Sequence, residues 1–152
     1  MNKEDSPIYL DSACMTLRPQ QVIDAITEYY TDYPACGGRS VHKLSWQVTE
    51  KFEMARDSLR KFVGAEQPSE IVFTKNATEG MNIVANGLRL KKGDHVLTSD
   101  KEHNANVVPW HHLSKYNGIK YDVLEPKDNY FFDLEALKES ITPDTKIFSF
   151  VH

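Results

Sequence analysis

Apolar residues recur at helical spacing in two stretches of the first 64 residues. The first stretch covers residues 19–33, and its apolar positions are Val22, Ile23, Ile26, Tyr29 and Tyr30. The second covers about residues 45–62 and keeps to one helix face, at Val48, Phe52, Ala55, Leu59 and Phe62. This spacing predicts two helices. Pro34 ends the first because proline cannot continue a helix, Gly64 caps the second, and residues 35–40 form a loop.

Beyond Gly64 the pattern changes to short apolar runs that alternate with helical stretches. The runs are rich in β-branched and aromatic residues and predict four strands, at residues 70–75, 95–99, 119–124 and 146–151. Helices are predicted at residues 77–90, which Gly93 ends, at residues 109–116, which Gly118 ends, and after Asp133 as N-cap. This alternation predicts an α/β fold, with a parallel or mixed sheet and flanking helices.

Composition narrows the class of protein. The chain has 152 residues, 40% apolar and 26% charged, which is typical of one globular domain with a single core. The net charge of -4 is spread along the chain, so no basic stripe indicates nucleic acid as a partner. The sequence has no apolar run that spans a membrane and no signal-peptide pattern at its start, so we expect a cytoplasmic protein. Cys14 and Cys36 stand in no metal-ligand spacing and fit a reducing compartment.

The turn Asn76-Ala77-Thr78-Glu79 joins a predicted strand to a predicted helix. Ligands of parallel sheets lie at the carboxyl ends of the strands, and free N–H groups at a helix N-terminus favour an anion. Ala77 lets a phosphate approach the backbone, and Thr78 adds a hydroxyl donor. The alternative is an ordinary N-cap with no ligand.

A second polar turn, residues 99–106, follows the next predicted strand and carries His103. A histidine here suits an acid, a base, a metal ligand or a flat surface for an aromatic ring, and the alternative is a solvated loop residue. His111 and His112 are adjacent on the following helix and face apart, so no second ligand completes a metal site and we predict none.

Four segments, in order and at similar separations, carry a resemblance to a known family. They read YLDSACMTLRP, GGRSVHKLSWQVTEKFEMAR, FTKNATEGMNIVANGL and KEHNANVVPW. Together they resemble the N-terminal portion of the pyridoxal phosphate (PLP)-dependent cysteine desulfurases of the class V aminotransferases, in the group that includes the selenocysteine lyases. The resemblance implies a fold-type I PLP enzyme, with residues 1–18 packing near the small domain and residues 19–152 forming part of the large domain.

The resemblance implies roles for individual residues. Ala77 and Thr78 match the turn that binds the cofactor phosphate, and His103 matches the histidine that stacks on the pyridine ring. Asn104 departs from the family's frequent second histidine. Arg39 and His42 match a loop at the dimer interface near the active site, with a solvated loop as the alternative.

The implied activity is conversion of L-cysteine to L-alanine with transfer of a persulfide to an acceptor or scaffold protein of iron-sulfur or thiolation pathways. The implied enzyme is a homodimer. None of the lysines here has the context of the Schiff-base lysine, and neither Cys14 nor Cys36 matches the nucleophile, so we expect both to be buried or interface thiols. We therefore expect this chain to be inactive alone and to need a C-terminal half. The strand predicted at residues 70–75 lacks its family neighbours here, so the isolated chain is expected to pair, swap elements or fold in part.

Other readings keep the fold and change the role. Selenocysteine lyase, aminotransferase and kynureninase-like activities share these motifs. A third reading is a non-catalytic half that assembles with a partner chain.

Overall fold

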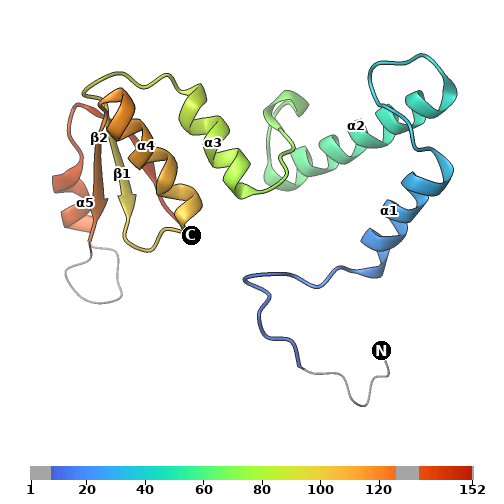
Figure 1. Ribbon diagram of the computed structural model, residues 1–152, viewed down its shortest axis with the longest axis horizontal. Coiled ribbons are helices and arrows are strands. Elements are labelled where there is room, and N and C mark those ends of the chain that lie inside the picture. Colours follow the sequence, from blue (N-terminus) through green and yellow to red (C-terminus); the bar gives the residue numbers. More distant parts are fainter. Residues whose placement is uncertain (1–7, 126–133, 152) are drawn as a thin grey trace. The chain divides into compact units, whose positions relative to one another are not determined.

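The computed structural model describes residues 8–125 and 134–151. The chain forms two compact units, Met1–Val72 and Phe73–His152, which are described separately (Figure 1). This boundary differs from the predicted division at residue 18, which stays a prediction.

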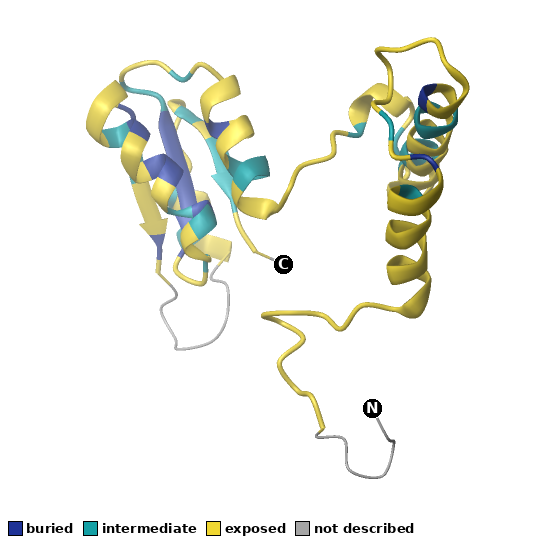
Figure 2. Ribbon diagram, turned by 45° about the vertical axis from the view of Figure 1, so that its right-hand side comes forward, coloured by how far each residue is buried: buried dark blue, intermediate teal, exposed yellow. Residues whose placement is uncertain are grey.

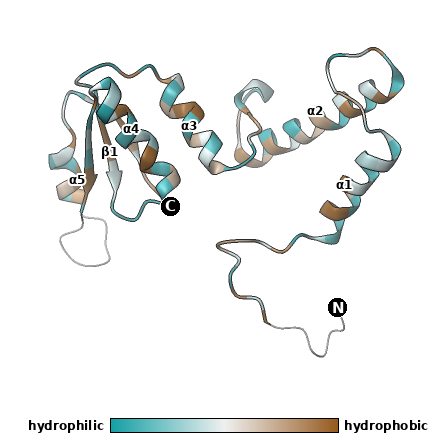
Figure 3. Cartoon of the chain, viewed as in Figure 1, coloured by the Kyte–Doolittle hydropathy of each residue, from teal (hydrophilic) through white to brown (hydrophobic). Residues whose placement is uncertain are grey.

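The first unit contains the two predicted helices, α1 (Gln20–Asp32) and α2 (Lys43–Val63), so both predictions are confirmed. The imidazole of His42 caps α2 by accepting a hydrogen bond from the Ser45 N–H at 3.3 Å. Gly64 ends α2 in the left-handed conformation, at φ 73°, as its sequence position predicts. Apolar side chains of both helices are exposed, and Figure 3 shows these hydrophobic turns alternating with hydrophilic ones.

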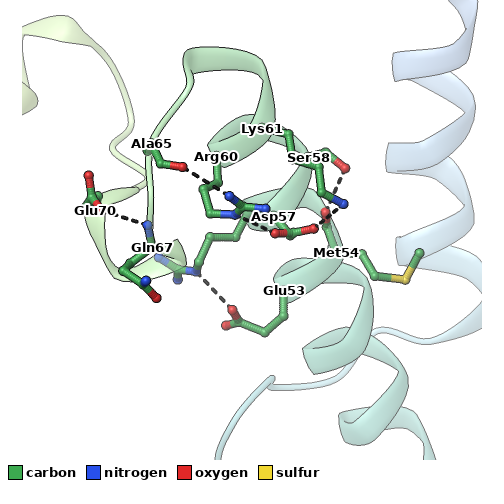
Figure 4. Close-up of polar contacts among 10 residues, drawn as sticks. Glu53, Met54, Asp57, Ser58, Arg60, Lys61, Ala65, Gln67 and Glu70 are labelled. Atoms are coloured by element: carbon green, nitrogen blue, oxygen red, sulfur yellow. Dashed lines mark hydrogen bonds and ion pairs between the residues drawn. The ribbon is translucent and has the colours of Figure 1, made fainter.

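Ion pairs along the last turns of α2 stabilise it at neutral pH. The Asp57 carboxylate lies 2.7 Å from both Arg60 Nε and Lys61 Nζ (Figure 4). Hydrogen bonds from Lys61 and Arg60 hold the pKa of Asp57 below its ordinary value of 3.8. A carboxyl group with a lowered folded-state pKa adds stability above its unfolded-state pKa, and this stability is lost as the pH falls through the folded-state value.

We therefore expect Asp57→Asn to lower the stability of α2 at neutral pH and to flatten its acid dependence. The effect is small because exposed ion pairs are screened by water and salt. Circular dichroism at 222 nm, recorded during heating of samples at a series of pH values from about 6 to about 2, measures the thermal stability of the helix at each pH. Glu50→Gln, an exposed carboxylate of the same helix, is the control. Equal pH dependence in the wild type and Asp57→Asn would contradict the role of the pair.

The strand predicted at residues 70–75 is wrong. A 3-10 helix, η1 (Pro68–Glu70), covers its start, and residues 71–75 belong to no strand. A strand exists only when a neighbouring strand accepts its hydrogen bonds, and an apolar run gives no information about its neighbour. Here the carbonyl of Ile71 accepts a hydrogen bond from the Arg56 guanidinium instead.

The second unit contains the other three predicted strands, β1 (His95–Ser99), β2 (Lys120–Leu124) and β3 (Thr145–Ser149). They form a parallel sheet in the order β2-β1-β3, which confirms the α/β class. The central strand β1 is buried along its whole length (Figure 2). The sheet therefore has a carboxyl edge at which the segments after β1 and β3 come together.

Three helices accompany the sheet: α3 (Ala77–Gly87), α4 (Val108–Asn117) and α5 (Leu134–Ser140). Side chains of α3, α4 and the sheet share one core cluster, whose buried members are Ala85, Val96, Trp110, Leu113 and Ile119. Pro109 lies in the first turn of α4 and Gly118 ends it at φ 74°, as predicted. The predicted N-cap Asp133 lies outside the described residues.

The structure also bears on the two cysteines and on the search for a membrane-spanning helix. Cys14 and Cys36 are both exposed, because each lies in a segment without regular secondary structure around it. The buried alternative is therefore wrong for both thiols, and the interface alternative stays a prediction. Within residues 8–125 and 134–151, no helix has the length and apolar character needed to cross a membrane.

Candidate functional site

The two polar turns singled out in the sequence line one pocket in the second unit. The pocket has a volume of about 280 Å³, and its lining residues are Thr78, Asn82, His103, Asn104, Ala105, Val108 and Pro109. Thr78 comes from the first turn of α3, and His103 comes from the loop after β1. This volume is near the lower end of small-molecule sites, roughly 300 Å³. The structure thus brings Thr78 and His103 together.

The N-terminus of α3 combines a cap with free donors. Asn76 accepts a hydrogen bond from the Glu79 N–H at 2.9 Å, and the Glu79 carboxylate accepts one from the Lys75 N–H at 2.6 Å. Among the described residues, the N–H groups of Ala77 and Thr78 have no acceptor. The cap and an anion site were alternatives from the sequence, and they use different donors. The helix dipole adds about half a positive charge at this end.

Thr78 and Asn82 are one helical turn apart on α3. The Asn82 side-chain amide donates to the Thr78 carbonyl at 2.9 Å, and both residues line the pocket. Sequence reasoning missed Asn82. The spacing of four residues from Thr78 is the signal that would have found it, because such residues share a helix face.

His103 caps the short 3-10 helix η2 (Asn104–Asn106). Its Nδ1 accepts a hydrogen bond from the Ala105 N–H at 3.0 Å. A neutral imidazole that accepts at Nδ1 carries its proton on Nε2, so Nε2–H is a donor. The ring is exposed and lines the pocket, which leaves a flat aromatic surface for a ligand.

The other histidines of this unit have different surroundings. His111 and His112 lie on α4 and face apart, as predicted, with His111 against Tyr121 at 4.7 Å and His112 against Tyr116 at 4.6 Å between ring centroids. Over the described ranges, no group of three or more His, Cys, Asp or Glu side chains is placed to hold a metal ion.

Arg39 and His42 belong to the first unit. His42 is the N-cap of α2, and Arg39 is exposed in the loop before it. His42 thus has a structural task that its sequence position did not reveal. The role of both residues in a dimer-interface loop stays a prediction.

The pocket fits two parts of pyridoxal phosphate. Thr78 lines the pocket and offers a backbone N–H and a hydroxyl at a helix N-terminus, which suit a phosphate, and the exposed imidazole of His103 suits an aromatic ring. Ala77, the residue before Thr78, is not among the lining residues. The pocket lining includes no lysine within the described part of the chain, so none of the lining side chains is an amine that could form a Schiff base.

Comparisons with known proteins identify a family and several similar proteins. The family model described as aminotransferase class-V matches residues 8–152. A "probable cysteine desulfurase" of Vibrio cholerae is 38% identical over 148 residues, which cover 95% of this chain and 37% of that protein. The solved apo structure of a cysteine desulfurase from Thermococcus onnurineus NA1 has a TM-score of 0.86 and 36% identity, over 94% of this chain and 36% of that one.

A more distant solved structure shares the fold alone. It is a C-DES mutant with glycine linked covalently to its PLP cofactor, with a TM-score of 0.76 and 23% identity, over 89% of this chain and 35% of that one. The chain thus spans about a third of the length of the proteins that it matches.

Proposed function

The chain belongs to the class-V aminotransferase family, and we propose that it supplies the phosphate-binding turn and the ring-stacking histidine of a PLP-dependent cysteine desulfurase. One observation supports this most directly: Thr78 and His103, from two separate turns, line the same pocket. The relatives named cysteine desulfurases support the choice of reaction within the family.

The start of α3 and the pocket each have a task in this proposal. The N–H groups of Ala77 and Thr78, with the Thr78 hydroxyl, hold the phosphate at the positive end of α3. The His103 ring lies against the pyridine ring, and its Nε2–H stays free to donate. PLP, when bound, supplies an electron sink for the amino-acid substrate.

The whole enzyme's reaction is also a proposal. L-Cysteine loses its sulfur as the Cβ–S bond breaks, an enzyme thiol gains that sulfur as a persulfide, and L-alanine leaves with the proton of that thiol. The persulfide then passes to an acceptor or scaffold protein. We propose a cytoplasmic homodimer, with Arg39 and His42 near the subunit interface and residues 1–18 packing near the small domain.

Replacing Thr78 with valine tests the phosphate site. Valine keeps the shape and the backbone N–H but removes the hydroxyl, so we expect PLP to bind about tenfold more weakly, as for one hydrogen bond to a charged group. Pyridoxal, which lacks the phosphate, should bind the wild type and Thr78→Val equally. Fluorescence titration measures both.

Thr27→Val, an exposed threonine on α1, is the matched control for this substitution. If Thr78→Val weakened pyridoxal and PLP alike, the hydroxyl would not contact the phosphate.

The catalytic proposal needs a Schiff-base lysine and a nucleophilic cysteine, which these residues do not supply. Co-expressing the chain with the part of the Thermococcus onnurineus enzyme that it does not match supplies a lysine and a cysteine in the family context. Release of alanine from L-cysteine would support the desulfurase, and a preference for selenocysteine would support a selenocysteine lyase. Stable association without cofactor or activity would favour the non-catalytic half.

A further inference from the structure

We propose that Glu102 and Asn106 are positioning residues that aim His103 at the pocket. The inference rests on the proposed function, because it assigns a task to residues beside the ring-stacking histidine. Neither residue lines the pocket. They lie on either side of His103 in sequence and join four elements through hydrogen bonds.

Trp110 determines how the Asn106 side chain is turned. The indole Nε1–H is only a donor, and it lies 3.1 Å from Asn106 Oδ1 in the buried core. The Ser149 hydroxyl at the end of β3 donates to the same oxygen at 2.8 Å. The amide nitrogen of Asn106 therefore faces the other way, toward Glu102.

This orientation requires residue 102 to offer an acceptor to the Asn106 amide, and its other oxygen must accept from two further donors. The Asn106 amide donates to Glu102 Oε2 at 2.7 Å. Glu102 Oε1 accepts from the Ser99 hydroxyl at 2.5 Å and from the Val151 N–H at 2.7 Å. A carboxylate meets this demand and a carboxamide does not, because one end of a carboxamide only donates.

The carboxylate thereby ties the loop to the carboxyl edge of the sheet. Ser99 is the last residue of β1, and Val151 follows β3. Between Glu102 and Asn106, the His103 carbonyl accepts from the Asn106 N–H at 2.8 Å, and His103 Nδ1 accepts from the Ala105 N–H. Rotation of the ring away from the pocket breaks the bond to Ala105, so the loop and the ring are held together.

The donor and acceptor order can be reversed by two isosteric substitutions. Glu102→Gln places a donor against the donor of Asn106, and Asn106→Asp places a carboxylate against that of Glu102. In the double variant, the carboxamide introduced at position 102 donates to the carboxylate introduced at position 106. The remaining oxygens of both side chains still accept from Ser99, Val151, Trp110 and Ser149.

The test uses amide hydrogen exchange of Ala105, measured by NMR without any ligand. We expect each single substitution to speed this exchange by about tenfold and to shift the His103 imidazole ¹⁵N resonances, with both effects reversed in the double variant. Amides of β1 should keep their protection, which separates loop release from unfolding. Glu66→Gln, an exposed residue of the first unit, is the control for loss of charge.

PLP titration of the same four proteins gives an independent measurement. Weakened binding in the single variants, with recovery in the double variant, supports the positioning role. Unchanged Ala105 exchange in the single variants, or no recovery in the double variant, overturns it. If the wild type fails to bind PLP, the proposed function fails, and the exchange data still decide whether Glu102 and Asn106 hold His103.

Discussion

His103→Ala is expected to weaken PLP binding by about thirtyfold, or about 2 kcal/mol, because it removes the aromatic face of the pocket. The imidazole is exposed at the pocket wall and its Nδ1 is already bonded to the Ala105 N–H, so the ring face is what a ligand meets. His103→Phe keeps a flat ring and should recover most of the affinity. Fluorescence titration with PLP measures the affinity of the wild type, His103→Ala and His103→Phe.

The matched control is His112→Ala. His112 is another exposed histidine of the second unit and lies against Tyr116 on the same helix. Alanine at residue 112 should leave PLP affinity unchanged. If His103→Ala and the wild type bound PLP equally, His103 would have no stacking role, and the proposed site would lose its aromatic surface.

The sequence predicted most of the fold because its signals are local. Gly64 and Gly118 end helices in the left-handed conformation that glycine adopts without strain, and both were read from their positions. The strands β1 to β3 were found from short apolar runs. The prediction at residues 70–75 used the same signal and was wrong, because a strand also needs a paired neighbour. The apolar run does not reveal that neighbour, and the resemblance implied that it is missing here.

The candidate site shows the same limit. Asn76, Ala77 and Thr78 form a local motif, so the sequence predicted the helix N-terminus and its donors. The hydrogen bonds that Ser149 donates to Asn106 and Val151 donates to Glu102 join residues 43 and 49 positions apart. Such contacts follow from the parallel pairing of β1 and β3, so the positioning of His103 could not be predicted from the local sequence.

Trp110→Ala is expected to have the largest effect on stability, about 3–5 kcal/mol, as for a large aromatic removed from a core. The Trp110 side chain is 0% exposed and packs with Ala85, Val96, Leu113 and Ile119. Its loss leaves a cavity and also removes the donor that orients Asn106. Urea unfolding, followed by NMR through the amide resonances of β1 and α4, gives the free energy of unfolding of the second unit.

Two further variants separate packing from hydrogen bonding at this position. Trp110→Phe fills most of the cavity but lacks the indole N–H, so it should cost less than Trp110→Ala and still speed the exchange of the Ala105 amide. Trp46→Ala removes the chain's other tryptophan, which is 62% exposed, and should change stability little. A Trp110→Phe variant with wild-type Ala105 exchange would show that the Glu102 and Asn106 contacts hold without the indole. The orientation of Asn106 would then be set by Glu102 and Ser149 alone.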